Sequence, residues 1–92
     1  MNDKMGIAIK LKVLPESPET DLEKLRNTIE QEINNLGGKL HSYEIEPIAF
    51  GLSALILTIA WTEEKELEEL EKRLKEIEGV SSVEVLDYRK TL

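Results

Sequence analysis

The sequence predicts an α/β (α+β) sandwich in which two helices cover one face of a four-stranded antiparallel sheet. Four segments have the apolar alternation or the apolar runs of strands, and two have the 3.6-residue spacing of helices. Their order is β-α-β-β-α-β, and the parts of the chain before and after residue 46 are roughly equal in length. Because crossovers between parallel strands are right-handed, these two halves predict the strand order 4-1-3-2.

The first half begins with a strand and continues with an amphipathic helix. In residues 6–14, GIAIKLKVL, large apolar side chains alternate with alanine and lysine, as in a half-buried strand. Leucine and isoleucine recur at helical spacing across residues 21–36, which predicts a helix with one apolar face. Thr20 and Glu23 have the spacing of a capping box at its start, and Ser17 is the alternative cap.

Four further elements complete the pattern. Residues 39–46, KLHSYEIE, alternate in polarity and predict a strand with one polar face. Residues 53–61, SALILTIAW, are nearly all apolar, which is typical of a central strand. Leucine recurs at helical spacing in residues 63–78, where Thr62 can cap a second helix. Residues 80–88, VSSVEVLDY, predict the last strand.

The length and composition of the chain narrow the class of protein. With 92 residues, we expect a single domain over residues 1–92, with residues 1–4 disordered. The chain has no cysteine, so disulfides and thiolate metal sites are excluded. It has no apolar run of about 18 residues and no visible secretion signal, so we expect a cytoplasmic protein without a membrane span. The net charge of −7 argues against general nucleic-acid binding and allows a basic protein partner.

The ionisable residues do not form a recognisable catalytic or metal site. His41 is the only histidine, and a lone histidine on a strand is usually a surface residue. The glutamates near the second predicted helix are interleaved with bases, which indicates a solvated, salt-bridged face. They are Glu63, Glu64, Glu66, Glu68, Glu69 and Glu71. We therefore expect no enzyme activity, no cofactor and no bound metal.

Aromatic residues are too few for the RNA-binding use of this strand order. Such modules stack bases on aromatic side chains of the two central strands. The first strand has no aromatic residue, and the third has only Trp61, at its end. Together with the acidic charge, this argues against direct nucleic-acid binding.

Phe50 departs from the pattern of a core residue. It is the only phenylalanine, and it lies between Pro47 and Gly51 instead of within a strand or helix. In one interpretation, the ring folds back over the open end of the core. In the other, Pro47 stiffens the chain, Gly51 supplies a permissive dihedral angle, and the ring points outward. An outward ring on a rigid loop is a typical anchor of a protein interface.

The end of the chain, DYRKTL, is the second departure. Arg89 and Lys90 place two cations at the end of an acidic protein. One interpretation is a frayed tail that aids solubility, as is common at termini. The other is a mobile cation that is presented to an anionic site.

At these two places the chain resembles the guanine-nucleotide exchange domain family of translation elongation factor 1-beta, and most closely its short archaeal form. The resemblance rests on the loop PIAFGL, on the basic end with a final leucine, and on the stretches LPESPETDLEKL and IEGVSSVEVLDYRK. It covers roughly residues 5–92. The family's fold is ferredoxin-like, which agrees with the arrangement predicted above.

The resemblance also implies a function. Family members bind elongation factor 1-alpha, a GTPase, in its GDP-bound or nucleotide-free form, and they promote GDP release so that GTP can rebind. The residues implied to contact the GTPase are Pro47, Ile48, Ala49, Phe50 and Gly51. Lys90 corresponds to the lysine that enters the magnesium and phosphate region. Many relatives place that lysine second from last, whereas Lys90 is third from last, so Arg89 is a second candidate that could share this role.

Two other functions fit the same order of elements. One is a ligand-sensing regulatory module of the ACT type, whose last strand resembles GVSSVEVL, residues 79–86. Such modules usually bind amino acids and accompany an enzyme domain. The other is a simple protein-interaction domain without exchange activity.

Overall fold

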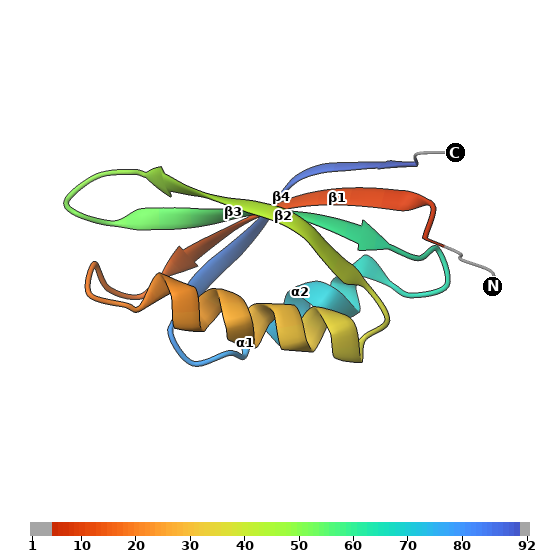
Figure 1. Ribbon diagram of the computed structural model, residues 1–92, viewed down its shortest axis with the longest axis horizontal. Helices are drawn as coiled ribbons and strands as arrows, with labels where there is room; N and C mark the ends of the chain where they lie inside the picture. Colours follow the sequence, from red (N-terminus) through yellow and green to blue (C-terminus); the bar gives the residue numbers. More distant parts are fainter. Residues whose placement is uncertain (1–4, 91–92) are drawn as a thin grey trace.

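The computed structural model describes residues 5–90, and the predicted disorder of residues 1–4 lies outside this range. Six elements follow one another in the predicted order (Figure 1). They are β1 (Ile7–Pro15), α1 (Leu22–Asn35), β2 (Lys39–Pro47), β3 (Ser53–Trp61), α2 (Leu67–Lys75) and β4 (Val80–Lys90). In residues 5–90, neither α1 nor α2 combines the length and apolar composition that crossing a lipid bilayer requires.

The four strands form one antiparallel sheet in the order β2-β3-β1-β4, which is the predicted order read from the opposite edge. Both helices lie on the same face of this sheet (Figure 1). Ile7 pairs with Trp61 on one side and with Lys90 on the other, so these three residues lie in one row across the sheet. The predicted ferredoxin-like fold is confirmed.

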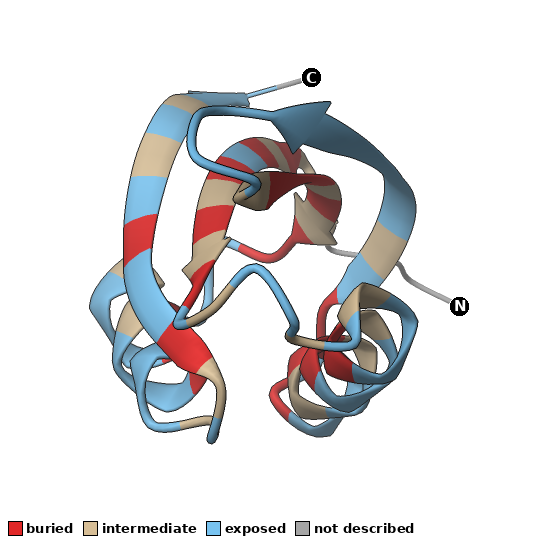
Figure 2. Cartoon of the chain, turned by 90° about the vertical axis from the view of Figure 1, so that its left-hand side faces the viewer, coloured by how far each residue is buried: buried red, intermediate tan, exposed pale blue. Residues whose placement is uncertain are grey.

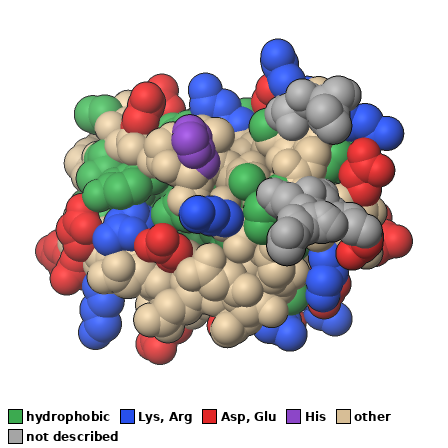
Figure 3. Space-filling model, turned by 45° about the vertical axis from the view of Figure 1, so that its right-hand side comes forward, with side chains coloured by type: hydrophobic (Ala, Val, Ile, Leu, Met, Phe, Trp, Pro, Cys, Tyr) green, Lys and Arg blue, Asp and Glu red, His purple; other side chains and the backbone are tan. Residues whose placement is uncertain are grey.

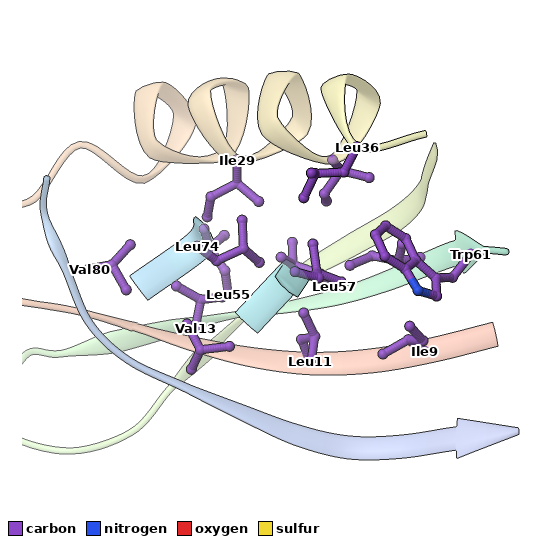
Figure 4. Close-up of a cluster of buried hydrophobic side chains, with 14 of the residues drawn as sticks. Ile9, Leu11, Val13, Ile29, Leu36, Leu55, Leu57, Trp61, Leu74 and Val80 are labelled. Atoms are coloured by element: carbon purple, nitrogen blue, oxygen red, sulfur yellow. The ribbon is translucent and has the colours of Figure 1, made fainter. Parts of the chain in front are cut away.

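The core lies between the sheet and the helices. The alternating apolar residues of β1 and β3 contribute one wall, and the apolar stripes of the helices contribute the other (Figure 4). Figure 2 shows that buried positions concentrate in this layer. The residues of the two central strands that belong to this core cluster are Ile7, Ile9, Leu11, Val13, Leu55, Leu57, Ile59 and Trp61. Because alternate residues of a strand point to opposite faces, the sequence pattern was sufficient to identify those of β1, whereas the nearly continuous apolar run of β3 did not show which side faces the core.

Helix α1 begins at a different cap from the one predicted. Asp21 has an extended backbone, and its Oδ1 accepts a hydrogen bond of 3.2 Å from the backbone N–H of Lys24. The predicted capping box of Thr20 and Glu23 is therefore wrong. The backbone N–H of Thr20 instead donates to the carbonyl of Ser17 in the preceding turn. Aspartate is as good a cap as serine and better than threonine, so this outcome agrees with the known ranking.

Helix α2 is shorter than the predicted span of 63–78. Thr62 is buried and does not cap the helix, because its Oγ1 accepts a hydrogen bond from the backbone N–H of Glu64 in a separate turn. The buried indole of Trp61 donates from Nε1 to the carbonyl of Lys65, at 3.3 Å. These contacts hold residues 61–65 in a turn, and the helix begins after it.

Strand β4 is longer than predicted and includes a bulge. It continues to Lys90, so Arg89 and Lys90 belong to the sheet and the expectation of a frayed tail is wrong for them. Val85 pairs with Leu11, whereas Asp87 pairs with the adjacent Lys10, which leaves Leu86 as an extra residue in β4. A bulge of this kind changes which later side chains point to each face of the sheet.

Contacts with α1 hold the exposed edge strand β2 in place. The guanidinium of Arg26 lies 4.8 Å from the centre of the Tyr43 ring and is also 2.9 Å from Oε1 of Glu30. The hydroxyl of Tyr43 donates to Oε2 of Glu23 at 3.1 Å. The strand that leads into the β2–β3 loop is thereby tied to the helix layer.

Candidate functional site

The loop between β2 and β3 closes on two backbone hydrogen bonds. The N–H of Ile48 donates to the carbonyl of Leu52 at 2.8 Å, and the N–H of Leu52 donates to the carbonyl of Ala49 at 2.9 Å. The two central residues, Phe50 and Gly51, have φ angles of 54° and 81°. Two successive positive φ values are the signature of a type I′ turn. The loop is therefore a compact turn with a defined backbone.

Phe50 projects from this turn into solvent, with 96% of its surface exposed. The interpretation in which its ring covers the end of the core is therefore wrong. Phe50 is also the only residue other than glycine with a positive φ in residues 5–90. A non-glycine residue in this region costs about 1–2 kcal/mol. The free protein thus holds an aromatic ring in solvent, at a backbone conformation that glycine or asparagine would adopt more easily.

The turn rests on other parts of the molecule and borders an apolar pocket. A Cβ atom on Gly51 would lie 3.6 Å from Cβ of Pro18, so the loop packs close to the β1–α1 connection. A pocket of about 360 Å³ lies beside the loop at this end of the sheet. Its lining consists of Lys12, Leu14, Ile48, Ala49, Phe50, Leu52, Ser82 and Glu84.

Arg89 and Lys90 point to opposite faces of the sheet and have different partners. Lys90 shares a face with its pairing partner Ile7, and its Nζ lies 3.4 Å from Oε2 of Glu63. Arg89 lies on the other face, where its Nε donates to Oδ2 of Asp87 at 2.8 Å. The two cations are therefore not interchangeable in this structure.

Sequence reasoning missed the contribution of Glu63. It was assigned to the solvated face of a helix, but α2 begins only at Leu67, and Glu63 lies in the turn after β3. It is 27 positions away from Lys90 in the sequence, so no local pattern indicates their contact. The usable signal is that Glu63 directly follows Trp61 and Thr62, at the end of the most apolar strand.

The structure does not bring Phe50 and Lys90 together. The β2–β3 loop lies at one end of the long axis, and the last residues of β4 lie at the other (Figure 1). The molecule measures 43 Å along this axis. Strand β3, from Ser53 beside the loop to Trp61 in the row of Lys90, spans eight residue steps, or about 26 Å. A single partner that contacts both sites must extend over this distance.

Two other residues of interest have contrasting positions. Trp61 is completely buried, so it cannot contact a partner while the protein is folded. His41 lies at an irregularity in the pairing of β2 with β3 and is exposed, as the single histidine in Figure 3 shows.

Within residues 5–90, no group of three or more histidine, aspartate or glutamate side chains is arranged to hold a metal ion.

Comparison with solved structures identifies the fold only. The C-terminal domain of the MgtC protein from Mycobacterium tuberculosis superposes with a TM-score of 0.68. The superposition covers 98% of this chain and 93% of that one, at 17% sequence identity. An identity this low transfers no function.

Comparison with known sequences is more specific. The EF-1 guanine nucleotide exchange domain matches residues 8–91. An elongation factor 1-beta from Methanothermobacter thermautotrophicus is 42% identical over 87 residues, which cover 94% of this chain and 97% of the relative. An elongation factor 1-beta from Staphylothermus marinus is 47% identical over 81 residues, or 86% of this chain and 89% of the relative.

These matches extend over both candidate sites and favour the exchange-domain interpretation over the ACT-type alternative. The protein belongs to the elongation factor 1-beta family and carries its guanine nucleotide exchange domain.

Proposed function

We propose that this protein binds elongation factor 1-alpha and accelerates the release of GDP from it, so that GTP can rebind. Phe50 and its turn, Pro47 to Gly51, form the docking contact. The observation that carries the proposal is the almost complete exposure of Phe50 on a strained and hydrogen-bonded turn. A folded protein has no internal use for a large aromatic side chain in this position.

The turn is suited to tight docking because its backbone is already ordered. Burying a phenylalanine side chain contributes about 1.5–3 kcal/mol relative to leaving it exposed. Since the loop is closed by the Ile48–Leu52 and Ala49–Leu52 hydrogen bonds, binding has little backbone entropy left to remove. The bordering pocket adds apolar surface next to the ring, so partner side chains can pack on both.

Lys90 supplies the exchange step in this proposal. GTPases hold GDP largely through Mg²⁺ and through contacts to its phosphates. An ammonium group that enters this region competes with the metal ion and disturbs the loops that hold it. No covalent bond is made or broken, so the protein needs no nucleophile and no general base.

The thermodynamics set one requirement. A factor shifts a nucleotide equilibrium only if it binds the nucleotide-free GTPase more tightly than the GDP-bound form. In the present structure, Phe50 at one end can supply affinity for both forms, whereas Lys90 at the other end can supply the difference between them. Because the length of β3, about 26 Å, lies between the two ends, the two tasks can be performed by different contacts.

The direct test is release of a fluorescent GDP analogue from elongation factor 1-alpha of the same organism. We expect the release rate to rise with the concentration of this protein and to saturate. A GTPase from outside translation, loaded with the same analogue, is the control and should not respond. An unchanged release rate from elongation factor 1-alpha would refute the proposed function.

A further inference from the structure

We propose that Glu63 is a positioning residue, which directs the ammonium group of Lys90 and thereby increases the rate of nucleotide release. This inference rests on the proposed function and adds a residue to it. The contact that supports it is the ion pair between Nζ of Lys90 and Oε2 of Glu63, at 3.4 Å.

Glu63 is part of a well-anchored turn. The residue before it, Thr62, is buried, and the one before that is Trp61, which is completely buried. The backbone N–H of Lys65 donates to the carbonyl of Thr62, and the indole of Trp61 donates to the carbonyl of Lys65. The backbone that carries the carboxylate is therefore fixed to the core.

The sheet register brings Lys90 to this carboxylate. Ile7 pairs with Trp61 and with Lys90, so the side chain of Lys90 emerges on the same face as Trp61, with β1 between their two strands. The bulge at Leu86 is essential to this arrangement. Without it, the pairing of Val85 with Leu11 would continue regularly, and Arg89 instead of Lys90 would lie opposite Ile7.

The expected contribution is small but measurable. Both side chains are more than half exposed, and exposed ion pairs have modest energies. The pair restricts the many rotamers of the lysine, so less conformational freedom is lost when the ammonium enters the partner's site. An effect of about two- to fivefold on the release rate corresponds to the range of exposed ion pairs.

The test compares Glu63→Gln with wild type in GDP release at saturating factor. Glutamine keeps the size of the side chain and removes its charge. We expect the rate to fall by about two- to fivefold, with the dissociation constant for the GTPase and the melting temperature unchanged. A rate equal to or above that of wild type would overturn the proposal.

Asp87→Asn is the matched control. It removes the same charge from the partner of Arg89, on the opposite face of the same strand. We expect its release rate to equal that of wild type. An equal loss in both variants would show a general effect of charge and would overturn the proposal.

A double-variant cycle separates positioning from other effects. In a Lys90→Ala background, Glu63→Gln should cause no further loss, because the group that it directs is absent. A further loss of the same size would overturn the proposal. If wild type accelerates release while these variants behave otherwise, only the role of Glu63 is wrong. If wild type fails to accelerate release, the proposed function is wrong, and the role of Glu63 is wrong with it.

Discussion

The two ends of the molecule hold their exposed residues in different ways. At the β2–β3 end, an aromatic ring stands on a turn that backbone hydrogen bonds close and that packs near Pro18. At the β4 end, two cations lie on an edge strand, and exposed ion pairs hold their side chains. At one end, the backbone of a turn sets the position of the ring; at the other, strand pairing orders the backbone and exposed ion pairs direct the side chains.

This difference matches two different tasks. An apolar anchor provides affinity, and it does so best when its conformation is already set before binding. A cation that enters a partner's site has to be directed without being held fast, and a weak exposed ion pair such as that of Lys90 does this. Variants that act on one end alone can therefore separate binding from exchange.

The largest expected effect is at the aromatic end. Phe50→Ala should weaken binding to elongation factor 1-alpha by more than about 2 kcal/mol, the size of an interface hot spot. The fold should be unaffected, because the ring has almost no contacts in the free protein. Isothermal titration calorimetry measures the affinity, and circular dichroism monitors the fold. An affinity equal to that of wild type would remove Phe50 from the interface.

The next effect is at the cationic end. Lys90→Ala should lower the rate of GDP release at saturating factor by at least about tenfold, since a hydrogen bond to a charged group contributes about 1.5–3 kcal/mol. Its effect on binding should be smaller. Arg89→Ala is the matched variant and should have much less effect, because Arg89 points to the other face. The reverse order of the two effects would assign the exchange step to Arg89.

The smallest effect is on stability, and it concerns the strain at Phe50. Asparagine followed by glycine is the preferred pair in a type I′ turn, so Phe50→Asn should stabilise the fold by about 1 kcal/mol while weakening partner binding. Urea denaturation measures the free energy of unfolding. Phe50→Ala is the control: it also removes the ring, but it keeps an unfavourable backbone angle and should not gain stability. Equal stability of the two variants would show that the turn is not strained.

Much of the fold followed from local patterns. The alternation in residues 6–14 predicted the buried side of β1, and the apolar run in residues 53–61 predicted the second central strand. The span of α1 was predicted to within one residue at each end, although Asp21 and not Thr20 is its cap. The limits of α2 were less well predicted, because the contacts of Trp61 delay its start. Capping depends on which of several neighbouring polar groups reaches the first free N–H groups, and that requires coordinates.

The candidate site, too, could be predicted from the sequence only in part. Its location was visible in the sequence, since Phe50 between chain-breaking residues and two cations in an acidic chain both depart from the rest of the pattern. The sequence did not show in which direction each of these side chains points. A loop has no periodicity that separates inside from outside, and a positive φ at a phenylalanine is too rare to expect.

The sequence by itself determined the order of the elements, the apolar layer and the positions of the unusual residues, because spacing along the chain translates directly into faces of strands and helices. The tertiary structure decided that Phe50 is exposed, that the bulge at Leu86 places Lys90 beside Glu63, and that Arg89 faces away. These outcomes depend on pairing between strands and on contacts between residues far apart in the chain, which no local pattern encodes.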